Sequence, residues 1–249
     1  MLSKSQISLV NSLQQKKNRV ELGLFVVEGL KSITEFLNSD YVIDTLYFTK
    51  DVAISLPKIP QNIKLFEVNE QELKKISTLK TPQGILALVI IPQQNSHNNL
   101  YNSAKVHLVL DGIQDPGNLG TIIRTANWFG YTHIFCSPNT VDVYNPKTVQ
   151  AAMGALSQIK IIYTPLFALL SDARIPIYGA LLNGENIYKT QWPSHAFVVF
   201  GNEGLGISPE ILPLITKSIT IPSLGNTESL NVAVSAAIFC AQIQSYLQK

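Results

Sequence analysis

The sequence has little charge, few cysteines and no long apolar run, and each shortage excludes a class of protein. Only 14% of its 249 residues are charged and 46% are hydrophobic, which is typical of a globular chain rather than a disordered one. No apolar run reaches the ~18 residues that a membrane-spanning helix needs. The first residues also lack the apolar core of a signal peptide. We therefore expect a cytoplasmic protein that has no membrane partner.

The two cysteines and four histidines do not indicate a metal site or a disulfide. Cys136 and Cys240 lie far apart in apolar surroundings, which favours two buried free thiols in a reducing compartment. The histidines show no ligand spacing with one another or with the cysteines, so we expect no metal.

Charge gives a weak indication of a nucleic-acid partner. The net charge is only +2, but the opening stretch is locally basic, with Lys16, Lys17 and Arg19 ahead of the first acidic residue, Glu21. Taken alone, such a run is more often a solvated helix face than an RNA contact.

Alternating strand and helix patterns predict two α/β regions. The first, residues 1–95, is followed by a polar linker at 96–104 and a second domain at 105–249. In the first region we expect strands at 24–27, 42–48, 63–68 and 85–91, and helices at 3–17, 29–38 and 69–78. In the second we expect strands at 106–110, 132–136, 159–163, 176–181, 196–200 and 217–221, and helices at 118–129, 146–156, 165–172, 208–214 and 229–247.

The strands of the second domain are continuously apolar, which suits a parallel sheet covered on both faces. Its last helix is apolar around most of its circumference and must therefore be buried. That burial could be against the sheet or against a second subunit.

Three turns rich in glycine and asparagine follow apolar runs of the second domain. They lie within 111–124, 201–208 and 221–231. Because open α/β sheets bind ligands at the carboxyl ends of their strands, three such turns predict a common pocket. No Gly-Lys-Ser/Thr follows the glycines, which excludes a P-loop, and the order G-x-x-G-x-G is not the dinucleotide pattern, so a NAD-linked enzyme is a weak alternative.

These turns supply the candidate site residues. Glycine allows a ligand to approach the main chain closely, so the Gly201 turn could grip a flat, neutral base through backbone hydrogen bonds. Ser229 could cap the last helix and leave amides free for a carboxylate or phosphate. Arg124 lies on the same helix face as Gly117. The polar candidates are Asn118, Arg124, Asn202, Glu203, Glu228, Ser229 and Asn231.

In order and spacing, the three turns resemble the signature motifs of the SpoU (TrmH-like) family of RNA ribose 2′-O-methyltransferases, in the SPOUT superfamily. The residues that carry the resemblance are Asp115-Pro-Gly-Asn-Leu-Gly…Arg124, Gly201-Asn-Glu-Gly-Leu-Gly and Ile221-Pro…Ser229-Leu-Asn231. Upstream, the segments 16–19, 25–29 and 81–84 resemble the substrate-binding domain of many members. The resemblance covers essentially the whole chain.

The resemblance implies an α/β fold with a deep trefoil knot (SPOUT), preceded by a small L30e-like α/β domain that binds RNA, with Lys16, Lys17 and Arg19 as phosphate contacts. It implies S-adenosylmethionine as cofactor and a homodimer formed through the knotted domain. By motif, the cofactor would be lined by Gly201, Asn202, Gly204, Leu205, Gly206, Ile221 and Leu230.

The resemblance also assigns catalytic residues. Family accounts give the proton-accepting role to Arg124, but a guanidinium is effectively always protonated. We prefer an Arg124 that binds the adjacent phosphate and stabilises the developing alkoxide. Asn118, Glu203, Ser229 and Asn231 would then position Arg124 and the ribose.

One departure concerns substrate contacts. Relatives often carry Arg and Ser where Gln150 and Ala152 stand, ahead of the Gly-Ala pair at 154–155. Two rival functions remain: a knotted methyltransferase that acts on a base, and a non-catalytic RNA-binding protein. Ribosomal RNA is the favoured target, with transfer RNA as the alternative.

Overall fold

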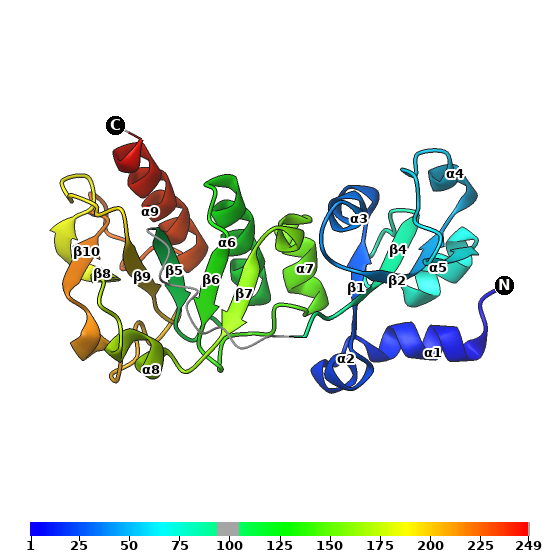
Figure 1. Cartoon of the computed structure of the whole chain (residues 1–249), viewed down its shortest axis with the longest axis horizontal. Helices are drawn as coiled ribbons and strands as arrows, with labels where there is room; N and C mark the ends of the chain where they lie inside the picture. The colour runs from blue at the N-terminus through cyan, green and yellow to red at the C-terminus, as the bar shows by residue number, and fades with distance from the viewer. Residues whose placement is uncertain (94–104, 249) are drawn as a thin grey trace. The chain divides into compact units, whose positions relative to one another are not determined.

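The computed structural model describes residues 1–93 and 105–248, so the predicted linker at 96–104 lies outside the described residues. The chain forms two compact units, which are described separately below (Figure 1). Unit 1 comprises Met1–Asn95 together with Asp142–Gln158, and unit 2 comprises Ser96–Val141 together with Ile159–Lys249.

Unit 1 is built around a four-stranded sheet with the order β1-β4-β2-β3. β4 runs antiparallel to both of its neighbours, and β3 pairs in parallel with β2 at the edge. The elements are α1 (Lys4–Ser12), α2 (Lys16–Leu22), β1 (Leu24–Glu28), α3 (Leu30–Leu37), β2 (Ile43–Phe48), α4 (Lys50–Ala53), β3 (Lys64–Glu67), α5 (Glu70–Ile76), β4 (Ile85–Ile90), α7 (Pro146–Ala152) and the 3-10 helix η1 (Ala155–Ser157).

The helix predicted over 3–17 is two helices in the structure. Ser3 begins α1 with a capping box that it shares with Gln6, which satisfies free backbone amides of the first turn. The chain leaves the helix at Leu13, and α2 then ends at Gly23, whose φ of 64° is left-handed. Glycine adopts that conformation without the steric cost of a side chain.

The segment Asp142–Gln158 belongs to unit 1, although the sequence analysis placed it in the second domain. The side chain of Asp142 pairs with Arg19, with Nη2 to Oδ2 at 2.5 Å. The ring of Tyr144 lies 4.6 Å from that of Phe25, centroid to centroid. A polar bond and an aromatic contact across more than a hundred residues therefore tie this segment to the first unit, and hydrophobic periodicity carries no information about such a return.

Unit 2 is a six-stranded sheet with the order β10-β8-β9-β5-β6-β7, and every pairing in it is parallel. The α/β class and the parallel sheet are thus confirmed, whereas the trefoil knot stays a prediction. The elements are β5 (Val106–Leu110), α6 (Pro116–Trp128), β6 (His133–Cys136), β7 (Lys160–Tyr163), α8 (Leu166–Ser171), β8 (Ile177–Asn186), β9 (Ala196–Phe200), the 3-10 helix η2 (Leu212–Leu214), β10 (Lys217–Thr220) and α9 (Val232–Leu247).

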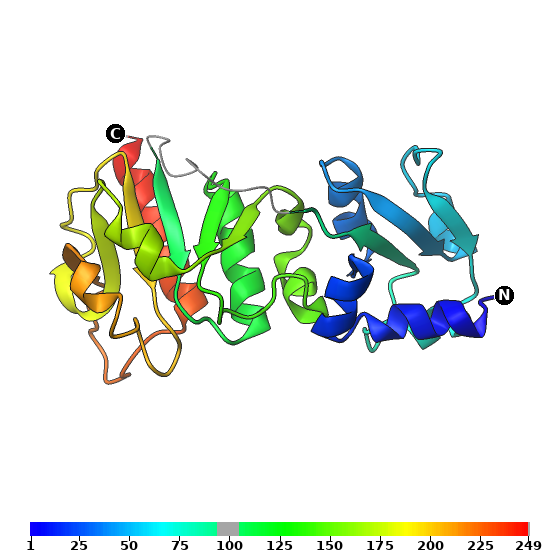
Figure 2. The same cartoon turned by 60° about the horizontal axis from the view of Figure 1, so that its bottom comes forward.

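The two faces of this sheet are covered by different elements. On one face Val109 and Phe197 share a buried cluster with Leu170 of α8 and with Ile207. On the other face, Phe200 packs edge-on against Phe239 of α9, with the two ring centroids 5.3 Å apart. α6 lies beside α9 on that face (Figures 1 and 2). Burial on both faces explains the continuous apolar strands.

Two predicted helices of this unit were placed wrongly. The segment 208–214 is not an α-helix but turns that end in η2, because Pro213 cannot donate a backbone hydrogen bond within a helix. α9 begins at Val232 rather than at 229. Within residues 1–93 and 105–248, no helix is long and apolar enough to cross a membrane.

Candidate active site

Three loops of unit 2 leave the same edge of the parallel sheet. They follow β5, β9 and β10, and they contain the three motifs found in the sequence. β5 and β9 are direct neighbours, paired from Val106↔Ala196 to Leu110↔Phe200. In the sheet, β6 and β7 follow on one side of β5, whereas β8, β9 and β10 lie on its other side. This reversal of strand order makes the carboxyl end of β5 a switch point, where open α/β sheets bind ligands.

The Gly201–Gly206 loop folds into a tight hairpin after β9. Asn202 and Gly206 exchange two backbone hydrogen bonds of 2.9 Å each. The Asn202 side chain accepts from the amides of Gly204 and Leu205, at 2.9 and 3.0 Å. A Cβ added at Gly201 would lie 2.2 Å from the carbonyl carbon of Gly206, so only glycine allows the two arms to approach this closely.

The first motif forms the N-terminus of α6. Asp115 caps the helix by accepting the backbone N–H of Asn118 at 2.8 Å, and Pro116 opens the first turn. Both choices suit this position, because an acidic cap satisfies a free amide and proline has none to leave unpaired.

One hydrogen-bonded chain of side chains joins the three motifs. Asn118 Nδ2 donates to Glu203 Oε1 at 3.0 Å, and Asn231 Nδ2 donates to Asn118 Oδ1 at 2.9 Å. Asn231 also caps α9 through its Oδ1, which accepts the amides of Ala233 and Val234 at 2.9 and 3.3 Å. The predicted cap, Ser229, was therefore wrong, and the residue two positions later has that role.

The carboxylate of Glu203 is held in its ionised form. Partial burial raises its pKa, but the hydrogen bonds from Asn118 and from backbone amides outweigh that effect, so the pKa lies below its usual value. The amides include Gln114 and Asp115, at 3.3 and 3.4 Å. Glu203 is thus a fixed negative group and a weak base near neutral pH.

Arg124 and Ser229 stand apart from this chain of side chains. Arg124 is exposed on α6. Within the described parts of the sequence its guanidinium makes no ion pair or hydrogen bond with another residue. Ser229 lies in the exposed stretch 222–231 between β10 and α9. The structure therefore brings together Asn118, Glu203 and Asn231, and leaves Arg124 free to meet a ligand.

The three basic residues proposed for RNA are not equivalent in unit 1. Lys16 and Lys17 are exposed at the start of α2. Arg19 is only 2% exposed, and it donates to the carbonyls of Leu13 and Gln14 at 2.8 and 2.9 Å besides pairing with Asp142. Its position does not support a phosphate contact.

Cys136 and Cys240 are free and buried, as expected. Among the residues that the structure describes, no group of three or more His, Cys, Asp or Glu side chains could hold a metal ion.

Asp111 and Gln114 lie in the first of the three turns, and the sequence did not single them out. In the structure Asp111 is buried and accepts the amide of Ser208 at 2.7 Å, and the Gln114 amide contacts Glu203. An acidic residue directly after an apolar strand was a signal for Asp111, but its partner lies 97 positions away and could not be read from the sequence.

Comparison with known proteins identifies the family. The model of the SpoU rRNA Methylase family matches residues 105–241, more than half of the chain. The chain belongs to this family. The model of the MRM3-like substrate binding domain matches residues 4–87, ahead of the SpoU segment.

Individual relatives agree with this assignment. The chain is 31% identical to the Bacillus subtilis 23S rRNA (guanosine(2553)-2′-O)-methyltransferase RlmP, over 91% of this chain and 90% of that one. A putative RNA methyltransferase of the TrmH family from Porphyromonas gingivalis has 38% identity and a TM-score of 0.88, with 98% of both chains covered. An AdoMet-bound rRNA methyltransferase from Sinorhizobium meliloti has 26% identity and a TM-score of 0.88, over 99% of this chain and 97% of that one.

The loops of this SpoU chain fit the S-adenosylmethionine on which the family depends. Leu205, Leu224 and Leu230 are 89%, 103% and 49% exposed, so all three present apolar surface where the loops open to solvent. Such side chains can cover a purine ring and a thioether chain, and the glycine-rich backbone beside them can hydrogen bond to the base. The residues present therefore suit the cofactor.

Proposed function

We propose that this SpoU-family chain methylates a ribose 2′-hydroxyl of ribosomal RNA at the edge of the unit 2 sheet, with Arg124 as the group that meets the substrate. The reaction class follows from the family: an S-adenosylmethionine-dependent RNA 2′-O-methyltransferase. The observation that carries the site assignment is the Glu203–Asn118–Asn231 chain, which links all three motifs through hydrogen bonds of 3.0 and 2.9 Å.

Bound S-adenosylmethionine would supply a methyl group that is already activated on a sulfonium, so the protein's task is alignment and charge stabilisation. We propose that Gly201, Asn202, Gly204, Leu205, Gly206, Ile221 and Leu230 hold it, largely through main-chain groups. The hairpin geometry of the Gly201–Gly206 loop supports this, because its backbone is fixed from within by Asn202.

Arg124 is proposed to bind the phosphate next to the target ribose and to stabilise the oxygen as it loses its proton. A guanidinium cannot accept that proton near neutral pH, but its fork of N–H donors suits a phosphate and a developing alkoxide. The exposure of Arg124 and the lack of a partner for it within the described residues support a role toward a ligand.

Asn118, Glu203 and Asn231 are proposed to hold the ribose in place. Glu203 stays ionised and anchors Asn118, and Asn118 in turn fixes the orientation of Asn231 at the start of α9. Ser229, two residues earlier, lies in the same exposed loop and is proposed to contact the ribose directly.

Ribosomal RNA is proposed as the target because two relatives that match nearly the whole chain, RlmP and the Sinorhizobium meliloti enzyme, are named for it. Lys16 and Lys17, both exposed on α2, are proposed to contact phosphates, which adds affinity without sequence information. We also propose a cytoplasmic location, consistent with the two free thiols.

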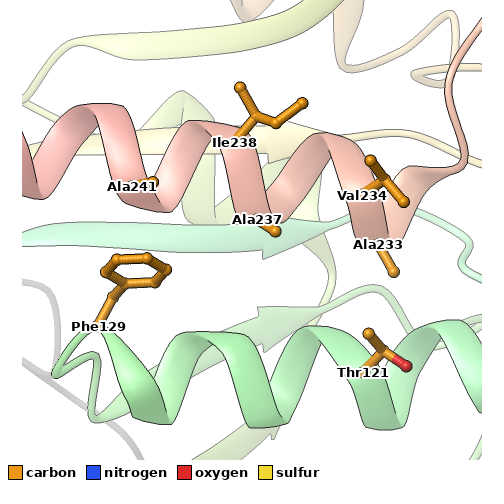
Figure 3. Close-up of a pocket in the computed structure, with 7 residues that line it drawn as sticks. All are labelled: Thr121, Phe129, Ala233, Val234, Ala237, Ile238 and Ala241. Carbon is orange, nitrogen blue, oxygen red and sulfur yellow. The ribbon is translucent and has the colours of Figure 1, made fainter.

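A homodimer is proposed through the exposed face of α6 and α9. Between these helices runs an apolar groove of about 450 Å³, lined on α9 by small or branched side chains (Figure 3). A surface of that kind, open to solvent along two helices, suits helix packing by a second copy. The lining residues are Thr121, Phe129, Ala233, Val234, Ala237, Ile238 and Ala241.

The test is methyl transfer to ribosomal RNA by the purified chain, with the modified ribose mapped by its resistance to alkaline cleavage. We expect incorporation at a 2′-oxygen. Arg124→Ala should lower kcat by about 100-fold or more, the usual loss when a donor to a developing oxyanion is removed. Arg124→Lys should lose most of that activity too, because lysine lacks the planar fork.

Two results would contradict the proposal. Methylation of a base instead of a ribose would overturn the reaction assigned to the site. Activity of Arg124→Lys near wild type would show that charge alone suffices and that the fork geometry has no role.

A further inference from the structure

The carboxylate of Asp111 is buried where β5 ends, and the roles proposed above do not use it. Asp111 is only 7% exposed, and its Oδ2 accepts the backbone N–H of Ser208 at 2.7 Å. Its own backbone N–H donates to the carbonyl of Phe200 at 2.8 Å. Phe200 directly precedes the Gly201–Gly206 loop, and Ser208 follows it by two residues. A single residue directly after the neighbouring strand β5 therefore bonds to both ends of this loop.

The tip of the loop is held differently. Asn202 organises it from within, and the Asn202 Nδ2 donates to the carbonyl of Gly112 at 2.7 Å. Gly112 is the residue after Asp111, and its φ of 73° is left-handed. Two consecutive residues after β5 thus fix the loop, Gly112 by its backbone carbonyl and Asp111 by its side chain.

The shape of the loop depends on where its second arm lies. The backbones of Gly201 and Gly206–Ile207 are so close that a Cβ on Gly201 would lie 2.2 Å from both the Gly206 carbonyl carbon and the Ile207 nitrogen. Ser208 is the next residue of that second arm. With no room between the arms, a shift of Ser208 moves Ile207 and Gly206 against Gly201. The bond from the Ser208 amide to Asp111 ties this arm to the end of β5, whereas the Ser208 carbonyl accepts the amides of Ile211 and Leu212 further along the same segment.

The carboxylate suits this task better than a neutral side chain. A backbone amide bonds more strongly to an ionised acceptor than to a neutral one, so a buried carboxylate gives the stiffer anchor. Such burial is costly unless the group is hydrogen bonded, and here the amide of Ser208 supplies that bond.

We propose that Asp111 is a positioning residue for S-adenosylmethionine: it does not touch the cofactor, but it holds the Gly201–Gly206 loop in its binding shape through the amide of Ser208. This inference rests on the proposed function, which assigns that loop to the cofactor. It adds a residue whose loss weakens cofactor binding without removing any group from the reacting atoms.

The test compares S-adenosylhomocysteine binding by titration calorimetry in the full chain and its variants. Asp111→Ala should raise the Kd by about tenfold or more, the equivalent of a lost hydrogen bond to a charged group. Asp111→Asn keeps an oxygen acceptor but a weaker one, so it should raise the Kd less than Asp111→Ala does. In Asp111→Ala the KM for S-adenosylmethionine should rise in step with the Kd, while kcat at saturating cofactor changes by less than about threefold.

Thr216→Val is the matched control. The Thr216 hydroxyl donates to the carbonyl of Ile177 and accepts its amide, at 2.9 and 3.0 Å, and Ile177 begins β8 at the opposite edge of the sheet. This variant also loses hydrogen bonds of unit 2, so its Tm should fall, but its Kd for S-adenosylhomocysteine should not change.

The outcomes separate cleanly. An Asp111→Ala protein that binds S-adenosylhomocysteine like wild type, or no worse than Thr216→Val, overturns the inference. If the alanine variant does not fold, Asp111→Leu restores volume without an acceptor and carries the same expectation. A wild-type chain that fails to bind S-adenosylhomocysteine overturns the proposed function itself, whereas tight wild-type binding with no effect at Asp111 overturns only the positioning role.

Discussion

The guanidinium of Arg19 is buried in unit 1, although the sequence around it is basic and polar. Its partner Asp142 is mostly buried as well, with 15% of its side chain exposed, and lies 123 positions along the chain. A buried ion pair is stable only while both partners are present, because either charge alone is poorly solvated.

Removal of one partner should therefore destabilise the protein strongly. We expect Asp142→Ala to lower the free energy of unfolding by about 3–5 kcal/mol, because the Arg19 charge stays buried without its carboxylate. Urea unfolding, monitored by circular dichroism, measures this change in the free energy of unfolding. Lys64→Ala is the control, since it removes an exposed ion pair to Asp44, with the lysine 65% exposed; it should cost less than about 1 kcal/mol. Equal effects in the two variants would contradict the burial of the Arg19 pair.

Glu203 makes a pH-dependent contribution. Its folded-state pKa is depressed, so its hydrogen bonds stabilise the protein above the unfolded value of about 4.3 and are lost as pH falls through the lower folded value. We expect wild type to be more stable than Glu203→Gln at pH 7, with the difference closing below about pH 4. Thermal melts of both proteins from pH 3 to 7 check this. A stability difference between the two proteins that stays constant over that range would mean that ionisation of Glu203 does not stabilise the fold.

At the scale of elements, the structure decides which of two residues caps the start of α9. Ser229 and Asn231 both have side chains suited to a helix cap, and they are two positions apart. Only the structure shows that Asn231 accepts the amides of Ala233 and Val234. Its other contact, with Asn118, joins two motifs 113 positions apart.

Substitution of each residue tests that cap. Asn231→Ala should lower the free energy of unfolding by about 1–2 kcal/mol, because two amides of the first turn lose their acceptor. Ser229→Ala, exposed and outside the helix, should change it by less than about 0.5 kcal/mol. Chemical denaturation of both variants measures their free energies of unfolding. A larger loss for Ser229→Ala than for Asn231→Ala would contradict the assignment of the cap to Asn231.

Local patterns predicted what depends on local sequence, as the elements of unit 2 show. The strands 106–110 and 196–200 match β5 and β9, because a strand buried on both faces is a continuous apolar run. No α-helix forms at 208–214, because Pro213 has no backbone N–H to donate within a helix. The motifs predicted that three loops share one edge. They could not predict which side chains bond, since Glu203 and Asn118 meet across 85 positions.

At the scale of the whole molecule, the face of α6 and α9 stays open to solvent in a single chain. Val234, which lines the apolar groove, is 48% exposed, and Trp128 at the end of α6 is 85% exposed. Apolar surface along two helices is what a helical interface between two copies requires.

A charged side chain placed in the groove should dissociate the proposed dimer into single chains. Ile238→Glu places a carboxylate among apolar groove residues and should shift the mass measured by light scattering from two chains to one, because a buried unpaired charge is costly. Leu212→Glu changes an exposed leucine of η2 outside the groove and should leave the mass unchanged. A wild-type protein with the mass of one chain would overturn the proposed dimer.

The return of Asp142–Gln158 to unit 1 has a consequence for synthesis on the ribosome. The first 95 residues leave the exit tunnel without the partners of Arg19 and Phe25, which are Asp142 and Tyr144. Unit 1 can complete its packing only after residue 158 has emerged, when β5, α6 and β6 have already been made. The nascent amino-terminal segment must therefore wait for these two partners while β5, α6 and β6 of the other unit are translated.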